Sequence, residues 1–289
     1  PQKVVRDILS LNRWPLAPIE AVIEAPTMRP DGTILAEPGY DSFTGLYYAP
    51  AAELAFPGVP DQPTRRQIED ALEMIVGLVA DFPFASPAAR ANWLGLFLTA
   101  VLRPAIRSHV PLALVDATTQ GTGKTMLSEL PSILATGTNP TLLAMPYNGE
   151  EWIKTITTTL MGSHPIVVLD NVGREIYSDE LAQVLTADIW TCRILGTNQS
   201  ARVANRTVWV ANGNNIKVRG DFSSRCYWIR LESKTSRPWE RSDFSVQDLR
   251  QHVRENRGEI IAAVLTLARG WWAAGQPARS APTQMRSFT

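Results

Sequence analysis

The sequence predicts an α/β fold, in which a parallel sheet is flanked by helices. Three observations lead to this prediction. Continuous apolar runs such as 165–169 are typical of strands that are covered on both faces. Segments with helical periodicity alternate with these runs along the chain. A polar loop that contains glycine lies between the run at 112–115 and the helix that follows it, which is the arrangement that holds phosphate groups at the carboxyl edge of such a sheet.

Composition narrows the class of protein. The 289 residues are 45% hydrophobic and 19% charged, as in soluble globular proteins, and no apolar run approaches a membrane span. We therefore expect a cytoplasmic protein without a membrane partner. Lysine plus arginine equals aspartate plus glutamate, at 28 each, so any nucleic-acid contact must be a local patch. Cys192 and Cys226 are remote from each other and from any histidine, which argues against a disulfide framework or a zinc site.

Residues 1–109 are expected to form an accessory segment. Strand-like pieces and turn signals up to residue 60 predict irregular β structure, with short strands at 19–24, 33–36 and 45–48. Two helices follow. The first covers 64–82, with Thr64 and Gln67 as a capping box, and the second begins at Ser86 and Pro87 and ends before Pro104.

Residues 110–275 are expected to form the α/β core, and 276–289 a tail or a linker to a missing region. The elements predicted for the core are a strand at 112–115, a helix from Lys124 that is kinked near Pro131, a helix at 150–161, a strand at 165–170, a short helix from Ser178, a β-hairpin with arms at 190–195 and 202–207, strands at 207–211 and 225–231, and tail helices at 246–255 and 259–272.

The polar loop carries the clearest chemistry. Residues 118–125 read TTQGTGKT, in which small residues let backbone N–H groups surround phosphate oxygens. Lys124 supplies positive charge, and the Thr125 hydroxyl is a ligand for Mg²⁺. Thr118 replaces the first glycine of the usual motif, and we expect Gly121 to supply the flexibility instead. The predicted nucleotide site is Thr119, Gln120, Gly121, Thr122, Gly123, Lys124 and Thr125. The alternative is a coincidental turn.

Asp170 ends an apolar strand and is predicted to hold Mg²⁺ together with Thr125. The alternative is an aspartate that caps the next turn. Asn171 follows, at the position where many ATPases with this loop have a second carboxylate. An amide orients water but does not accept a proton, so hydrolysis is slow or the base comes from elsewhere. The weaker candidates for that base are Glu129, Asp179 and Glu180.

Two further groups complete the predicted catalytic set. Asn214, with Asn212 as second choice, is placed to contact the γ-phosphate or the attacking water, unless Asn-Gly-Asn-Asn is only a tight turn. Arg225, or else Arg219, is a candidate for an arginine that enters a neighbouring subunit's site. The alternative reading of Arg225 is a surface residue paired with an acid.

The predicted hairpin is the best candidate for a nucleic-acid contact. Its arms carry Arg193, Arg202 and Arg206, and its tip carries Asn198 and Gln199. A ring of such hairpins would line a pore and hold the phosphates of single-stranded DNA. The alternative is an ordinary surface hairpin, since the tip has no lysine.

The order of phosphate loop, strand with aspartate, hairpin, strand with asparagine and arginine resembles the AAA+ ATPases. More narrowly, residues 118–125 and 206–225 are similar to segments of the superfamily 3 helicases and of the helicase portions of phage and plasmid primase-helicase replication proteins. The resemblance implies ATP and Mg²⁺ as cofactors, Asn214 as sensor, Arg225 as finger, and a hexamer that moves on single-stranded DNA. It also implies a primase-polymerase domain elsewhere in a longer protein. Asn171 and the uncharged hairpin tip depart from the pattern.

Three functions therefore compete. The first is a ring-forming, ATP-driven DNA helicase or translocase. The second is an assembly module in which bound nucleotide is structural and hydrolysis is negligible, and Asn171 is its best support. The third is a small-molecule kinase, which normally has a lid with several arginines. The sequence shows no clear lid of that kind, and the predicted hairpin is not an element that such a kinase normally has.

Overall fold

The computed structural model describes residues 2–10, 17–106, 108–193, 200–235 and 237–277. Its centre is a five-stranded sheet with the order β12–β6–β11–β8–β7, and each neighbouring pair of strands is parallel. The strands are β6 (Leu112–Ala117), β7 (Thr141–Leu143), β8 (Ile166–Val172), β11 (Val208–Asn214) and β12 (Cys226–Leu231). The predicted class, an α/β fold with a parallel sheet flanked by helices as in P-loop NTPases, is confirmed.

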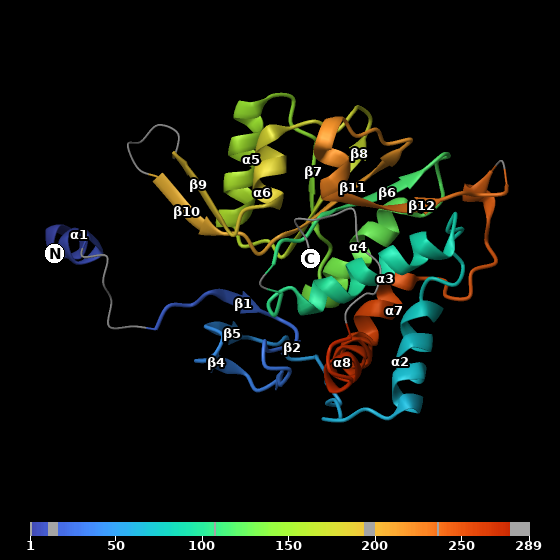
Figure 1. Cartoon of the computed structure of the whole chain (residues 1–289), viewed down its shortest axis with the longest axis horizontal. Coiled ribbons are helices and arrows are strands. Elements are labelled where there is room, and N and C mark those ends of the chain that lie inside the picture. Colours follow the sequence, from blue (N-terminus) through green and yellow to red (C-terminus); the bar gives the residue numbers. More distant parts are fainter. Residues whose placement is uncertain (1, 11–16, 107, 194–199, 236, 278–289) are drawn as a thin grey trace.

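Helices lie on both sides of this sheet (Figure 1). They are α2 (Arg65–Gly77), α3 (Pro87–Leu102), α4 (Lys124–Thr136), α5 (Gly149–Met161), α6 (Asp179–Leu185), α7 (Leu249–Glu255) and α8 (Arg257–Ala273), with short 3₁₀ helices η1 (Gly220–Arg225) and η2 (Pro238–Glu240).

Alternation along the buried strands divides the core into two apolar clusters, one on each face of the sheet. In β6, Ala113 and Val115 pack in the cluster that includes α2, α3, α4, α7 and α8. Leu112 and Leu114 pack in the cluster that includes α5 and α6. Because all six residues of β6 are buried, this strand is central to both clusters and holds the loop that follows it firmly.

Helix starts agree with the sequence signals. Thr64 and Gln67 form the predicted capping box, and Ser86 caps α3 ahead of Pro87. The predicted end of the first helix at residue 82 is wrong: α2 ends at Gly77. The next residues form tighter turns instead, in which Val79 N donates to Val76 O (3.2 Å) and Phe82 N donates to Val79 O (3.2 Å).

Pro131 lies inside α4, which runs as one helix from Lys124 to Thr136. A proline lacks the N–H group that would bond to the carbonyl four residues earlier. That carbonyl belongs to Leu127, and the indole Nε1 of Trp93 on α3 donates to it (3.3 Å). The missing backbone bond is thus replaced by a side chain, and Gly137 (φ +78°) then ends the helix.

The predicted hairpin is confirmed, but its arms are shifted. It consists of β9 (Ile189–Arg193) and β10 (Ser200–Ala204), with Arg193 opposite Ser200. Asn205 closes its base: the backbone N donates to Asp188 O (2.8 Å) and the side chain donates to Ala187 O (3.0 Å). For this reason β10 ends at Ala204, and Arg206 lies on the connection to β11 rather than on an arm.

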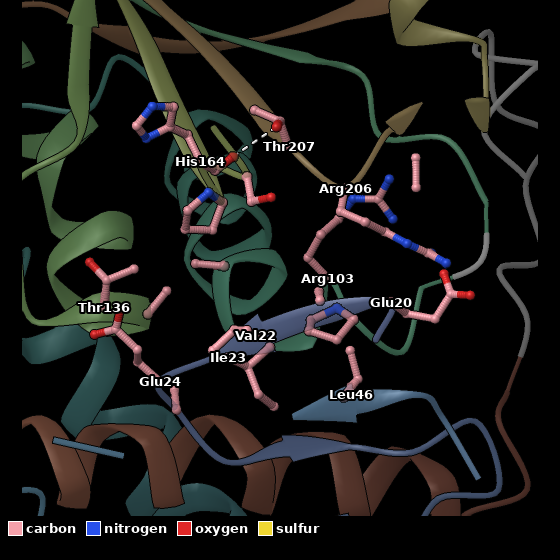
Figure 2. Close-up of a pocket in the computed structure, with 18 of the residues that line it drawn as sticks. Glu20, Val22, Ile23, Glu24, Leu46, Arg103, Thr136, His164, Arg206 and Thr207 are labelled. Carbon is pink, nitrogen blue, oxygen red and sulfur yellow. Dashed lines mark hydrogen bonds between the residues drawn. The ribbon is translucent and has the colours of Figure 1, made fainter. Parts of the chain in front are cut away.

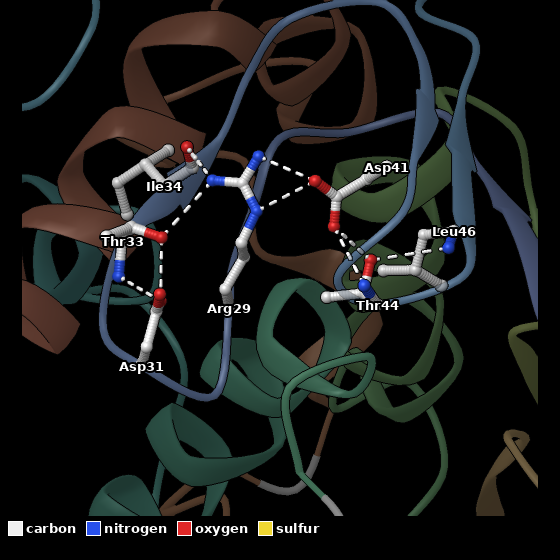
Figure 3. A network of polar contacts seen from close by, with 7 residues as sticks. All are labelled: Arg29, Asp31, Thr33, Ile34, Asp41, Thr44 and Leu46. Carbon is white, nitrogen blue, oxygen red and sulfur yellow. Dashed lines mark hydrogen bonds and ion pairs between the residues drawn. The ribbon is translucent and has the colours of Figure 1, made fainter.

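The N-terminal part contains the expected short strands and one helix that the sequence did not predict. These elements are α1 (Gln2–Ser10), β1 (Ala21–Ile23), β2 (Thr27–Met28), β3 (Ile34–Leu35), β4 (Gly39–Asp41) and β5 (Leu46–Tyr48). Arg29, which follows β2, links β4 and β3 by donating to the Asp41 carboxylate (2.9 and 3.1 Å) and to Ile34 O (2.9 Å) (Figure 3). This carboxylate also accepts from Thr44, and these contacts lower the pKa of Asp41, with the bond from Arg29 as the main cause.

The C-terminal helices join the N-terminal strands to the core. Arg257 of α8 is 5% exposed and donates to Leu134 O and Ala135 O (both 2.7 Å) and to Glu24 O (3.0 Å). Burial lowers the pKa of Arg257. Within the described part of the chain, we find no helix long and apolar enough to cross a bilayer.

Candidate functional site

The phosphate loop connects β6 to α4 at the carboxyl edge of the sheet. Gly121 (φ +73°) and Gly123 (φ +90°) both have left-handed backbones, which other residues adopt at a cost. Gly123 is also the residue before the first turn of α4, and no side chain caps that turn. The first N–H groups of the helix are thus available to an anion, as the sequence predicted.

Lys124 is half-buried at the start of α4. Its ammonium group donates to Thr119 O (3.3 Å), which folds the side chain back over the loop. Burial lowers the pKa of Lys124, and the negative charge of Asp116 opposes this shift. Next to it, Thr125 is exposed. A partly desolvated cation and an exposed hydroxyl at a helix start fit a phosphate–magnesium complex.

Two loop hydroxyl groups support the same interpretation. Thr119 Oγ1 and Thr122 Oγ1 are buried, and within the described part of the chain neither has a hydrogen-bond partner. Buried hydroxyl groups are normally bonded, so such atoms at a loop between strand and helix indicate a missing polar ligand. Gln120 and Gly121 are exposed beside them.

Asp170 lies on β8, two residues before the strand ends, and is partly exposed. Among the described residues no group donates a hydrogen bond to its carboxylate, so it is open to a cation. The adjacent Asn171 has a left-handed backbone (φ +52°) and forms the extra residue of a bulge against β11. Its backbone N donates to Asn212 Oδ1 (2.9 Å), while its side chain is exposed.

Asn212 and Asn214 lie within β11 and not in a turn after it, so the turn alternative is wrong. Asn212 is the residue that fixes the bulge at Asn171, and its own Nδ2 is buried without a partner in the described chain. Asn214 lies opposite Ala117, the last residue of β6, and its buried Oδ1 also has no partner there. Asn214 thus presents an unpaired polar atom beside the phosphate loop.

Asp116 is a residue of this site that the sequence reasoning missed. It is 1% exposed on β6. Its Oδ1 accepts from Ile216 N (2.8 Å), just beyond Asn214, and its Oδ2 accepts from Nη2 (2.9 Å) and Nε (3.1 Å) of Arg230 on β12. One carboxylate therefore joins three neighbouring strands at the edge that carries the loop.

The arginine candidates lie after β11. Arg225, the last residue of η1, donates from Nη1 to Ala182 O (3.1 Å) and to Thr186 Oγ1 (3.4 Å) on α6. Arg219 is exposed, with its guanidinium carbon 5.4 Å from the centre of the Tyr177 ring. Neither contact involves the phosphate loop of the same chain, and the finger role stays a prediction.

The weaker base candidates have different surroundings. Glu129 is buried on α4 and is paired with Arg250 of α7 (2.5 Å), so its charge is already compensated. Glu180 accepts from Ser178 Oγ (2.8 Å) at the start of α6, and Asp179 is exposed beside it. None of these contacts identifies a general base.

The hairpin residues are only partly described. Arg202 is exposed on β10, opposite Thr191. Arg193 ends β9, whereas Asn198 and Gln199 lie outside the described residues. Arg206 is partly buried on the connection to β11. As predicted, Arg193 and Arg202 lie on the arms of one hairpin. Arg206, which was predicted on an arm, lies outside it.

A pair of exposed tyrosines lies at the same edge of the sheet. Tyr147 follows β7 and is 86% exposed, with the Arg174 guanidinium carbon 4.3 Å from its ring centre. Arg174 is held by Met145 O (2.9 Å) and Pro146 O. Tyr177, 55% exposed, is paired with Arg219. The sequence reasoning missed these residues because it did not predict β7, whose end places Tyr147 at the edge.

A separate cavity of about 230 Å³ lies at the opposite, amino edge of the sheet (Figure 2). It is lined by β1 and by Arg103, Arg206, His164 and Thr207. Arg103 is 7% exposed and donates to Ile106 O (2.7 Å) and Asn205 O (2.9 Å). Burial, then the neighbouring charge of Arg206, lowers the pKa of Arg103 to about 10. Arg103 thus donates hydrogen bonds to backbone carbonyls. The cavity lies at the opposite edge of the sheet from the phosphate loop.

The residues at the carboxyl edge fit a nucleotide with Mg²⁺. Among the described residues, polar atoms of Thr119 and Thr122 in the loop and of Asn214 beside it have no hydrogen-bond partner. Asp170 lies on β8, which is separated from β6 by β11. Among the described residues no three His, Cys, Asp or Glu side chains gather around one point. Magnesium held by one carboxylate, one hydroxyl and phosphate oxygens requires no such cluster.

No protein-family model matches the sequence, and no curated protein matches it. Among solved structures, an apo A form of the NrS-1 C-terminal region is similar, with a TM-score of 0.48 and 13% identity over 92% of this chain and 59% of that chain. A structure of its residues 305–718 gives 0.45 and 16%, over 76% and 48%. JCV helicase gives 0.34 and 12%, over 72% and 61%. This chain thus spans less than two thirds of each of these three chains.

Proposed function

We propose that this chain is the motor domain of a ring-forming DNA helicase or translocase, which hydrolyses ATP between subunits and moves on single-stranded DNA. The observation that carries the proposal is the carboxyl edge of the sheet. There the phosphate loop, Asp170 and Asn214 come from strands that are neighbours in space. The buried oxygens of Thr119, Thr122 and Asn214 have no hydrogen-bond partner among the described residues. The order of motifs, which resembles the superfamily 3 helicases, supports a hexamer within a longer replication protein that also has a primase-polymerase domain.

Each residue of this edge has a role in the proposal. Backbone N–H groups of residues 119–125 and the Lys124 ammonium bind the phosphates, and Thr125 with Asp170 holds Mg²⁺. When bound, the metal ion neutralises charge on the transferred phosphate. Asn214 orients the terminal phosphate or the attacking water. Asn212 fixes the backbone of Asn171, and Arg225 of a neighbouring subunit stabilises the developing charge.

The DNA contacts of the proposal come from two elements. Arg193 and Arg202 on the hairpin bind phosphates. Arg202 is exposed, so it reaches a nucleic-acid backbone without losing its own hydration. Tyr147 offers an exposed ring that Arg174 holds from one side, which suits stacking with an unpaired base. Such contacts are independent of base sequence, as a translocating protein requires.

The second candidate is an assembly module that binds nucleotide without turning it over. Asn171 favours it, because an exposed amide occupies the position after the metal-binding aspartate. Its left-handed backbone is fixed by Asn212, so the side chain has a defined position but no proton-accepting group. Slow hydrolysis with tight nucleotide binding is the result expected of this module.

The test is steady-state ATP hydrolysis by the purified chain with and without single-stranded DNA. We expect turnover that DNA stimulates, and its loss in Lys124→Ala. The matched control is Lys154→Ala, because Lys154 is a partly exposed lysine on α5 that pairs only with Glu150 and Glu151 among the described residues. Turnover indifferent to DNA contradicts the motor proposal. Tight ATP binding without turnover moves the function to the assembly module.

A further inference from the structure

Two aromatic residues lie directly against the glycines of the phosphate loop. A Cβ atom built on Gly121 would lie 2.9 Å from the Cβ of Trp239 and 3.1 Å from its backbone N. A Cβ atom built on Gly123 would lie 2.5 Å from Cε1 of Phe82. The separations of 2.9 Å and 2.5 Å are shorter than real Cβ atoms show. A larger residue at either position would therefore displace its neighbour, in addition to the cost of the positive φ angle. The loop is thus flanked by an indole and a phenyl group.

The two flanking segments are tied to each other. Trp239 belongs to η2, within the connection from β12 to α7, and Phe82 follows Asp81 in the connection from α2 to α3. The Asp81 carboxylate accepts from Ser245 N (2.7 Å) and from Nη2 of Arg241 (3.3 Å). Arg241 also donates to Asp81 O (2.5 Å). These contacts hold Trp239 and Phe82 on adjoining sides of one loop.

Exposure distinguishes the two rings. Phe82 is partly buried, and its ring centre is 6.4 Å from that of Phe84. Trp239 is 59% exposed, whereas the preceding Pro238 is buried and anchors the turn. Because the indole is attached to the Cβ beside Gly121, its ring lies within one side-chain length of the loop in every rotamer. The exposed indole beside the loop is therefore accessible to a ligand that occupies the loop.

The charges nearby favour a neutral group over a further phosphate. Arg237 pairs with Glu240 (3.1 Å), and Arg241 pairs with Asp243 (2.7 Å) and Asp81. The arginines of this segment are thus already compensated by carboxylates. A flat, uncharged ring next to bound phosphates is the description of a nucleobase, which stacks on aromatic side chains.

We propose that Trp239 and Phe82 form the subsite for the nucleobase of the nucleotide whose phosphates occupy the loop, with Trp239 as the stacking surface. The inference rests on the proposed nucleotide binding and adds to it how the base is held. Stacking uses the face that every base has, so the subsite favours large purine rings over pyrimidines and makes no base-specific hydrogen bond.

The experiment compares ADP with inorganic pyrophosphate, which has the same two phosphates but no nucleoside. Affinities of the full chain for both probes are measured by calorimetry in the presence of Mg²⁺. In Trp239→Ala we expect the ADP affinity to fall roughly 5- to 150-fold, as for loss of one stacked base, with the pyrophosphate affinity unchanged. Trp239→Phe, which keeps a ring, is expected to retain most of the ADP affinity. The matched control is Trp271→Ala, because Trp271 is an exposed tryptophan of α8 (47%).

The outcomes separate the two proposals. Unchanged ADP affinity in Trp239→Ala overturns the stacking role. An equal loss for both probes also overturns it, because Trp239 then only shapes the loop. If the unaltered chain binds pyrophosphate as tightly as ADP, the base contributes nothing and the subsite is wrong while the phosphate loop stands. If it binds neither probe, the proposed function and the subsite fail together.

Discussion

Asp116 is a buried carboxylate that links the strands next to the phosphate loop by hydrogen bonds. It accepts from Ile216 N, which fixes the turn beyond Asn214, and from Arg230 on the edge strand β12. The Arg230 side chain is half exposed, whereas Asp116 is not. Solvent therefore weakens the ion pair on the Arg230 side. The bond from Ile216 N to the Asp116 carboxylate, in contrast, is buried.

We expect Asp116→Ala to destabilise the fold by about 1–3 kcal/mol, because a buried N–H group loses its acceptor. Asp116→Asn keeps one acceptor oxygen and should lose less. Urea unfolding of the purified variants measures both free energies. Glu69→Ala is the control, since this exposed carboxylate on α2 pairs only with Arg65 in the described chain. A stability of Asp116→Ala equal to that of the unaltered chain would show that water replaces the carboxylate.

Lys124 gives the site a dependence on pH. Burial lowers the pKa of Lys124 below its ordinary value of 10.5. The protonated amine is the form that attracts phosphate, so ADP affinity is complete below this lowered pKa and is lost as the pH rises through it. Measurement of the ADP affinity at pH values from 7 to 10.5 should show that the affinity falls before pH 10.5 is reached. Lys124→Arg, with a guanidinium that stays charged, should show no fall; a fall in both forms would assign it to another group.

Some site residues could be predicted from the sequence and others could not, for a physical reason. The phosphate loop and Asp170 are encoded by contiguous stretches, in which an apolar strand is followed at once by the residues that we propose bind the nucleotide. The role of Asp116 depends on Ile216 and Arg230, which are distant in the sequence. The exposure of Tyr147 likewise depends on the edge strand β7, which has only three residues with no clear apolar pattern.

At the scale of elements, the hairpin is the part that projects from the sheet and carries exposed positive charge. We expect Arg202→Ala to weaken binding of single-stranded DNA and to reduce the slope of log K against log salt by about 0.7, the value for one phosphate contact. Arg193→Ala should behave similarly. Fluorescence anisotropy of a labelled oligonucleotide at several salt concentrations measures both effects.

The control for the hairpin is Arg65→Ala, an exposed arginine of α2 whose partner in the described chain is Glu69. ADP affinity should be unchanged in all these variants, because the hairpin is a two-stranded sheet separate from the sheet that carries the loop. Unchanged DNA binding in Arg202→Ala and Arg193→Ala would make the element an ordinary surface hairpin.

Prediction of elements succeeded where local chemistry defines an end. Side-chain caps at Thr64, Ser86 and Ser178 fix where α2, α3 and α6 begin. Ends that depend on tertiary contacts were displaced: β10 ends where Asn205 bonds to the loop before β9, and β11 continues through Asn214 because it pairs with β6 up to Ala117. Long-range pairing thus extended a strand through residues that favour turns.

At the scale of the whole molecule, Arg225 lies at the end of β12 that is remote from the phosphate loop of its own chain. Arg225 contacts α6 in the same chain and immediately precedes β12, whose first residue pairs with Leu112 at the start of β6. The phosphate loop, in contrast, follows the other end of β6 at Ala117. A second subunit that presents its Arg225 to this phosphate loop would complete the site. The proposed ring therefore makes a prediction about mixtures of inactive subunits.

We expect Arg225→Ala and Asp170→Ala each to abolish turnover alone, and their mixture to recover part of it. At equal amounts, random mixing gives about a quarter of the interfaces an intact Asp170 on one side and an intact Arg225 on the other, as the head-to-tail contacts of a ring require. Turnover should rise to about that fraction. Mixing Lys124→Ala with Asp170→Ala provides the matched control, because both defects lie on the same side of every interface and no intact site forms. If the first mixture stays inactive while labelled subunits are seen to exchange, Arg225 acts within its own chain through α6.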